Sequence, residues 1–100
     1  MNTPPATRAV LLNHSNGLHA RPAELFARTA LKFESRIEVL CRNERVDGKS
    51  ILHLLTMGAT QGTELVIEAD GKDAEQAVEA LARLVESDFA DTRIADGKTA

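Results

Sequence analysis

RAVLLNHSNGLHARPAELFARTALKF, residues 8–33, changes its hydrophobic period in the middle, and this change decides the fold. Val10 and Leu12 share one face of a short apolar run, which predicts a first strand over Arg8–Asn13. The dipeptide Asn16-Gly17 then signals a tight turn, because glycine readily adopts backbone conformations that other residues avoid. The chain is therefore expected to leave a strand and turn sharply before its next element begins.

A helix is predicted directly after this turn. Pro22 suits its first turn, where the missing N–H would have no intrahelical partner in any case. Apolar residues then recur at helical spacing, namely Ala23, Phe26, Ala27, Ala30 and Phe33. We expect this helix to start between His19 and Pro22 and to end near Lys32.

The rest of the chain alternates between the periods of strands and helices. Alternating apolar residues predict strands over Arg36–Cys41 and Glu64–Ala69, and Arg45–Gly48 can return beside the first of these as a hairpin. Ile51–Met57 predicts a short helix, and Ala74–Val85 has the clearest helical stripe. The predicted order is β-α-β-β-α-β-α. Because the strands alternate, we expect an antiparallel sheet covered by helices on one face, which is an α+β sandwich of two layers.

Polar residues precede two of the predicted helices. Ser50 is a natural N-cap for the short helix, because its hydroxyl can accept an unpaired N–H of the first turn. Asp73 is expected to cap the last helix, with Gln76 as its capping-box partner.

Length and composition restrict the classes of protein. A chain of 100 residues has room for one domain, which we place at 8–87, between a flexible lead-in at 1–7 and a mobile tail at 88–100. The formal net charge is −3 and aromatic residues make up 3% of the chain. Neither the basic face that a nucleic-acid backbone needs nor the aromatic platforms that single-stranded bases need are therefore expected.

The sequence also predicts a compartment. Cys41, the one cysteine, falls in an apolar strand pattern and is expected to be a buried thiol in a reducing environment. No window approaches the roughly 18 apolar residues of a membrane span. The first residues, MNTPPATR, lack the apolar segment of a secretory signal. We therefore expect a cytoplasmic protein that does not insert into a membrane.

The turn ends where the first helix begins, which brings His19 to the helix N-terminus. There the helix dipole and the unpaired N–H groups disfavour the charged imidazolium, and neutral imidazole is the nucleophilic form. The same N–H groups would face a phosphoryl group on the ring, and helix N-termini bind such anions well. Arg21 can add a charge-assisted hydrogen bond to a phosphoryl oxygen. The alternative for both residues is purely structural: a histidine that caps a helix beside a solvated arginine.

The histidines do not predict a metal site. His14, His19 and His53 lack the i, i+4 spacing of a helical ligand pair, and none has a cysteine or carboxylate partner at ligand spacing. We expect neither a metal nor another cofactor, and we interpret His14 as a polar residue at the end of a strand.

Three segments together resemble the HPr family, the histidine-containing phosphocarriers of the bacterial sugar phosphotransferase system. GLHARP at 17–22 is similar to the phosphohistidine motif of that family. DGKSILHLLTMG at 47–58 is similar to its second signature, and GTELVIEADG at 62–71 to its last strand and turn. The spacings between the three also fit, and the resemblance extends over residues 8–87, nearly the whole chain.

The resemblance implies a fold and a function. The fold is an open-faced β-sandwich, with a four-stranded antiparallel sheet under three helices, in agreement with the order predicted above. His19 would accept a phosphoryl group on Nδ1 from phosphorylated enzyme I, which phosphoenolpyruvate charges, and pass it to the A domain of a sugar-specific enzyme II. Arg21 would assist the transfer. The protein would be a stoichiometric carrier, not an enzyme, and a monomer that docks with each partner in turn.

The second signature implies a docking surface and a regulatory site. The predicted short helix carries more apolar residues than one face can bury, so some should be exposed near His19. The resemblance implies that Ile51, Leu52 and Leu55 face the partners, together with Ala20 beside the phosphohistidine. In many bacteria the family's serine at the position of Ser50 is phosphorylated by an ATP-dependent HPr kinase. A phosphate on Ser50, which would weaken enzyme I binding through its charge, is thus a hypothesis beside the N-cap role.

Other functions stay open at this point. The same motif fits a carrier of a fructose-specific system or of the nitrogen-related regulatory branch. A regulatory adaptor that binds a transcription factor or an enzyme after phosphorylation of Ser50 is a different class. Such adaptors in the family lack the active histidine, whereas His19 and Arg21 are both present. A small acyl-phosphate hydrolase on a similar fold would need a glycine-rich phosphate loop with an arginine and an asparagine, which the sequence lacks.

Overall fold

The computed structural model describes residues 4–90, and its elements follow the predicted order. The strands are β1 (Ala6–Leu11), β2 (Arg36–Cys41), β3 (Glu44–Asp47) and β4 (Glu64–Asp70). The helices are α1 (Ala20–Ala30), α2 (Ile51–Leu55) and α3 (Ala74–Glu86). Each element begins and ends within two residues of its predicted bounds.

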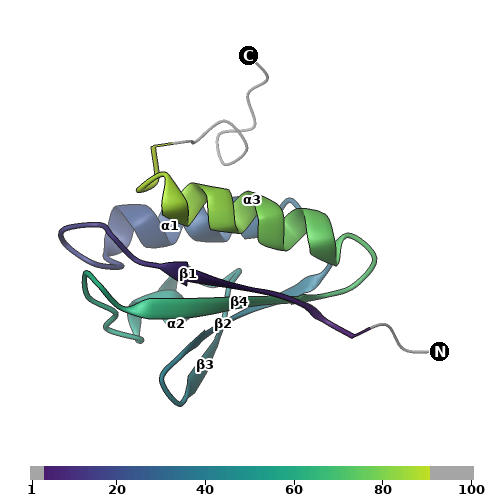
Figure 1. The fold of residues 1–100 in the computed structure, drawn as a ribbon, viewed down its shortest axis with the longest axis horizontal. Coiled ribbons are helices and arrows are strands. Elements are labelled where there is room, and N and C mark those ends of the chain that lie inside the picture. The colour runs from purple at the N-terminus through teal and green to yellow at the C-terminus, as the bar shows by residue number, and fades with distance from the viewer. Residues whose placement is uncertain (1–3, 91–100) are drawn as a thin grey trace.

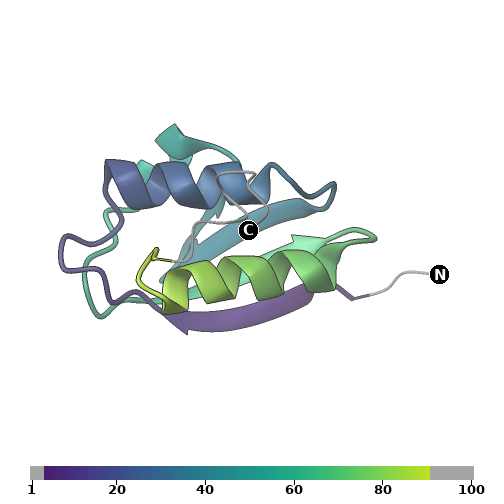
Figure 2. The same cartoon turned by 90° about the horizontal axis from the view of Figure 1, so that it is seen from above.

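The strands form one antiparallel sheet in the order β1-β4-β2-β3. Helices α1 and α3 lie side by side on one face of this sheet (Figure 1), as the view from above also shows (Figure 2). The short α2 packs beside α1 and near the edge strand β3. Because the helices leave the other face of the sheet open, the architecture is the expected open-faced β-sandwich.

The core lies between the helices and the sheet and is mostly aliphatic. Phe26 on α1 is its largest fully buried side chain, with 1% of its surface exposed. Alternate strand residues point inward, as the period of two requires, among them Ile37 and Val39 on β2 and Ile67 on β4. Cys41 is a buried free thiol, and its burial is what the apolar strand pattern predicts.

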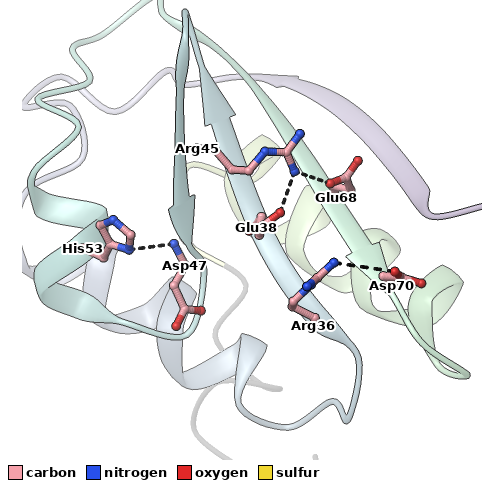
Figure 3. Close-up of polar contacts among 7 residues, drawn as sticks. All are labelled: Arg36, Glu38, Arg45, Asp47, His53, Glu68 and Asp70. Atoms are coloured by element: carbon pink, nitrogen blue, oxygen red, sulfur yellow. Dashed lines mark hydrogen bonds and ion pairs between the residues drawn. The ribbon is translucent and has the colours of Figure 1, made fainter.

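The open face of the sheet carries a network of ion pairs. Arg45 on β3 donates hydrogen bonds at 2.5 Å to Glu38 on β2 and to Glu68 on β4 (Figure 3). The two carboxylates lie directly opposite each other in the β2–β4 register, so the guanidinium offsets the repulsion between them. These hydrogen bonds raise the pKa of Arg45 above its ordinary value. The network is exposed to solvent and links strands β2, β3 and β4.

Asp73 does not make the cap that the sequence predicts. It occupies the N-cap position of α3, but its side chain makes no capping hydrogen bond. Its carboxylate accepts hydrogen bonds instead from Glu34 N, at 2.8 Å, and from Ser35 N and Oγ, at 3.0 and 2.5 Å. Ser35 is 1% exposed, and buried polar groups need partners. The carboxylate therefore ties the start of α3 to the connection between α1 and β2.

This tie makes stability depend on pH. The hydrogen bonds from Ser35 and Glu34 hold the pKa of Asp73 below its ordinary 3.8. A carboxyl group whose pKa is lower in the folded state stabilises the fold above the unfolded value and ceases to do so as pH falls through the folded value. We expect Asp73→Asn to lower the melting temperature at pH 7, and this deficit to shrink as pH falls below 3.8.

Asp70→Asn is the matched control for Asp73→Asn. The carboxylate of Asp70 makes a 3.8 Å ion pair with the exposed Arg36, and such pairs contribute little. Its melting temperature should stay close to that of the unchanged protein across the same pH series. An Asp73→Asn deficit that is equally large at pH 2.5 and pH 7 would contradict the role assigned to the charge.

Both ends of the packed domain extend beyond the predicted bounds of 8–87. Strand β1 begins at Ala6, inside the predicted lead-in, and pairs with β4 from that residue on. Phe89, inside the predicted tail, is 7% exposed and packs against the core. Residues 1–3 and 91–100, the remainder of the two predicted segments, lie outside the described residues. No helix in the described part of the chain has the length and apolarity to span a membrane.

Candidate functional site

Two loops meet at one end of the sheet, where the chain leaves β1 and where it enters β4 (Figure 1). Leu12 N donates to Thr63 O at 2.9 Å, and Gly62 N donates to Leu12 O at 2.7 Å. Further along, Leu18 N donates to Ala59 O at 3.0 Å. These backbone bonds fix the segment that ends in His19 against the loop 59–63.

Gly17 is required at the closest approach of the two loops. Its φ is +67°, in the left-handed region that favours glycine. A Cβ at this position would lie 2.4 Å from Ala59 O and 2.9 Å from Thr60 Cα. The turn predicted from Asn16-Gly17 is therefore present, and its glycine also makes room for the neighbouring backbone.

His19 stands at the start of α1 as its N-cap residue, in extended backbone conformation. Its carbonyl accepts the hydrogen bond from Ala23 N at 2.9 Å, and its side chain makes no capping bond. The ring is half-buried, and its Nε2 atom is fully buried with no hydrogen-bond partner. Nδ1 has no hydrogen-bond partner within residues 4–90 and is not fully buried, so it is the more accessible of the two ring nitrogens.

Among the three histidines, His19 alone keeps an uncommitted Nδ1 within residues 4–90. His14 Nδ1 accepts a hydrogen bond from Asn16 N at 3.3 Å. His53 Nδ1 accepts one from Asp47 N at 2.9 Å, across the end of β3 (Figure 3). A nitrogen whose lone pair is already engaged is a poor nucleophile. Of these three rings, His19 is therefore the one whose Nδ1 lone pair is free of a hydrogen bond.

The start of α1 also offers hydrogen-bond donors. The first N–H groups of a helix have no intrahelical acceptor, and here they belong to Ala20 and Arg21, since Pro22 has none. The first turn carries no acidic residue, so the positive end of the helix is not neutralised there. An anion attached to His19 would lie at this helix end.

Arg21 is adjacent but engaged elsewhere. Its Nη1 donates to Glu24 Oε1 at 2.9 Å, on the outer face of the first turns of α1. Both side chains are about half exposed, and such pairs contribute only ~0–1 kcal/mol. The guanidinium can therefore leave Glu24 for a stronger acceptor at low cost. The i, i+3 spacing of the two residues would have signalled this pair in the sequence.

His14 is a part of the site that sequence reasoning missed. The centroid of its ring lies 4.9 Å from that of His19, with the planes tilted by 57°. On its other side Phe89 meets it edge-on, at 6.0 Å between centroids. No local pattern could have shown this contact, because His14 and Phe89 come from opposite ends of the domain.

The predicted docking residues differ in exposure. Leu52 is the most exposed at 77%, Ile51 is 39% exposed, and Ala20 is also exposed. Leu55 is partly buried against the core, whereas Leu54 is fully buried. Helix α2, which carries the exposed leucine and isoleucine, packs against α1, the helix that begins just after His19.

Ser50 is the N-cap of α2, as predicted. Its Oγ accepts a hydrogen bond from His53 N at 3.1 Å. The side chain is half-buried at the point where β3 gives way to α2. Within residues 4–90, no three side chains of the types that bind metal ions gather in one place.

Known proteins resemble this chain in sequence and in fold. The sequence family described as "PTS HPr component phosphorylation site" matches residues 6–87. The chain is 48% identical to a phosphocarrier protein HPr of Haemophilus influenzae over 71 residues, which cover 71% of this chain and 84% of that protein. It is 40% identical to one of Mycoplasma capricolum over 73 residues, which cover 73% and 82%. A crystal structure of HPr from Thermoanaerobacter tengcongensis superposes with a TM-score of 0.82 at 41% identity, covering 86% of this chain and 97% of that one.

Proposed function

The chain belongs to the HPr family of phosphocarriers of the phosphotransferase system, and we propose that His19 carries the phosphoryl group from phosphorylated enzyme I to the A domain of a sugar-specific enzyme II. As a member of this family it is a carrier of phosphoryl groups and not a catalyst. The observation that supports His19 most directly is its outward, uncommitted Nδ1 at the start of α1. A carrier of this kind would work in the cytoplasm, as a monomer.

The burial of the ring supports phosphorylation on Nδ1. The lone pair that attacks phosphorus must be reachable by the donor, and Nε2 is fully buried. As the bond from Nδ1 to phosphorus forms, the bond from phosphorus to the donor breaks, and Nε2 keeps the ring proton. The N–H groups of Ala20 and Arg21 are available to donate hydrogen bonds to the phosphoryl oxygens.

We assign Arg21 the role of stabilising the phosphoryl group. A dianion at the helix start competes with one exposed carboxylate for the guanidinium, and a bidentate arginine–phosphoryl pair is the stronger of the two. The 2.9 Å pair with Glu24 would then be exchanged for the phosphoryl group when His19 is loaded.

Replacing Arg21 tests this role. Arg21→Ala should slow phosphoryl transfer from enzyme I about ten- to a hundredfold, the worth of one hydrogen bond to a charged group. The circular dichroism spectrum and melting temperature should not change, because only an exposed ion pair is lost. Arg21→Lys keeps the charge without the planar fork, so its transfer rate should lie between those of Arg21→Ala and the unchanged protein. Transfer by Arg21→Ala at the unchanged rate would remove Arg21 from the mechanism.

We propose that both partners dock over α1 and α2. Ala20, Ile51 and Leu52 are exposed, and Leu55 is partly buried against the core. Exposed apolar residues on α2 and at the start of α1, two helices that pack together, fit a surface that is covered only during transfer.

We also propose Ser50 as a regulatory site for an HPr kinase/phosphorylase. With ATP, such a kinase should add one acid-stable phosphate that Ser50→Ala does not receive. Loss of the N-cap in that variant should reduce the unfolding free energy by about 1 kcal/mol, which leaves the fold intact. Ser50→Asp keeps the cap and adds charge, and should weaken enzyme I binding relative to Ser50→Ala. Equal binding by the two variants would exclude an electrostatic switch.

The function as a whole is tested with purified partners. Enzyme I, Mg²⁺ and labelled phosphoenolpyruvate should place one acid-labile phosphate on the chain, and an A domain of a sugar-specific enzyme II should remove it. Transfer only to an A domain of the nitrogen-related branch would reassign the acceptor but keep the carrier. No labelling by any enzyme I, with the protein folded, would reject the proposal.

A further inference from the structure

The ring of His19 lacks the polar contact that normally fixes an imidazole. In most functional histidines, a hydrogen bond to the second ring nitrogen sets the tautomer and the orientation of the ring. Here that nitrogen, Nε2, is buried without a hydrogen-bond partner in the described part of the chain. Something else must fix the plane of the ring.

The side chain of His14 lies where it can do this. Its ring contacts that of His19, with 4.9 Å between centroids and a tilt of 57°, which is within the range of favourable ring pairs. His14 is itself fixed from two sides. Its Nδ1 accepts the hydrogen bond from Asn16 N at 3.3 Å, and the edge of Phe89 meets it at 6.0 Å.

The end of α3 is built to bring Phe89 to this place. Asp88 and Phe89 both have positive φ, at 58° and 62°, which turns the chain back on the helix. Phe89 N donates to Leu84 O at 2.8 Å, a bond that closes the helix C-terminus. Non-glycine residues in this conformation are uncommon, and two in succession are held here by the burial of Phe89, which is 7% exposed.

We propose that His14, backed by Phe89, is a positioning residue that holds the His19 ring with Nδ1 outward. This inference rests on the proposed function of His19 as phosphoryl acceptor. The proposal gives the segment at the C-terminal end of α3, which carries Phe89 and lies outside the phosphohistidine motif, a role in orienting His19. Contact between rings, not hydrogen bonding, sets the orientation of the nucleophile.

Substitutions at position 14 separate the effect of the ring contact from the effect of the hydrogen bond that the ring nitrogen accepts. His14→Phe keeps a ring against His19 but cannot accept the hydrogen bond from Asn16 N. His14→Asn can accept that bond but has no ring, and His14→Ala has neither. We expect His14→Ala and His14→Asn to be phosphorylated about tenfold more slowly by enzyme I, because misorientation of a reacting group is costly. His14→Phe should retain most of the rate.

The second measurement needs no phosphoryl donor. In ¹⁵N spectra of the unphosphorylated protein, the His19 ring should show one dominant tautomer with the proton on Nε2. His14→Ala and His14→Asn should move both ring signals toward averaged values, whereas His14→Phe should not. Phe89→Leu, which removes the aromatic edge but keeps an apolar side chain, should shift them in the same direction as His14→Ala and provides the test if that variant is poorly folded.

The outcomes distinguish this inference from the function on which it rests. If the unchanged protein is never phosphorylated, the function fails, and the spectra still decide whether His14 orients His19. Unchanged rates and unchanged His19 signals in His14→Ala would overturn the positioning role. If His14→Asn behaves as the unchanged protein while His14→Phe is slow, the loop hydrogen bond matters rather than the ring, and the inference is likewise overturned.

Discussion

His19→Ala should receive no acid-labile phosphate when enzyme I and phosphoenolpyruvate load the unchanged protein with one phosphate per chain. The substitution removes the imidazole of His19. Among the histidines of residues 4–90, it is the ring whose Nδ1 is neither buried nor hydrogen-bonded. It should leave the fold intact, because the side chain makes no capping bond to α1 and Nε2 is buried without a partner. Loss of labelling should therefore be complete at a melting temperature near the original.

The other two histidines are the controls for this experiment. His14 and His53 have their Nδ1 atoms engaged by Asn16 N and Asp47 N. At completion, His14→Ala and His53→Ala should each still carry one phosphate, whatever their rates. The ³¹P spectrum of the loaded protein should show phosphate on Nδ1, since Nε2 is not accessible. Full labelling of His19→Ala, or phosphate on Nε2, would falsify the assignment.

Short-range patterns predicted most of this fold. The change of period between Val10 and Phe26 located the first strand, the turn and the helix, and with them the position of His19 at a helix start. The N-cap at Ser50 was predicted correctly because it depends on residues only three apart, and local geometry determines it.

The errors came from contacts between distant parts of the chain. Asp73 has the composition of a cap, yet its carboxylate accepts instead from the amide of the buried Ser35, in the connection between α1 and β2. Phe89 follows a helix that loses its period, which predicted a tail, but a pair of left-handed residues returns it to the core. Composition alone does not reveal either event.

The site was predicted in part for the same reason. His19 and Arg21 lie within one local motif, and the structure places both at the start of α1. The partners of these two residues were not anticipated. The ring of His14 reaches His19 across a turn, and Glu24 holds Arg21 before any phosphoryl group is present.

Gly17→Ala should reduce both the free energy of unfolding and the rate of phosphoryl transfer, because Gly17 allows the close packing of the two loops that positions His19. A left-handed alanine costs about 1–2 kcal/mol by itself. Here the added Cβ would also meet Ala59 O at 2.4 Å, so the two loops must move apart. That movement strains the hydrogen bond from Leu18 N to Ala59 O, the last one before His19 that joins the loops. We expect a loss of about 3 kcal/mol in urea unfolding, together with transfer at least tenfold slower in the folded protein.

Gly58→Ala separates the two causes of this loss. Gly58 has nearly the same φ as Gly17, +60° against +67°, but a Cβ there would meet no atom within 4 Å. Gly58→Ala should therefore lose only the free energy of the left-handed conformation, about 1–2 kcal/mol, and keep its transfer rate. The difference between the two variants measures the close approach of the loops, since the left-handed backbone is common to both. If Gly17→Ala and Gly58→Ala unfold at the same urea concentration and transfer equally fast, the packing of these loops does not hold His19 in place.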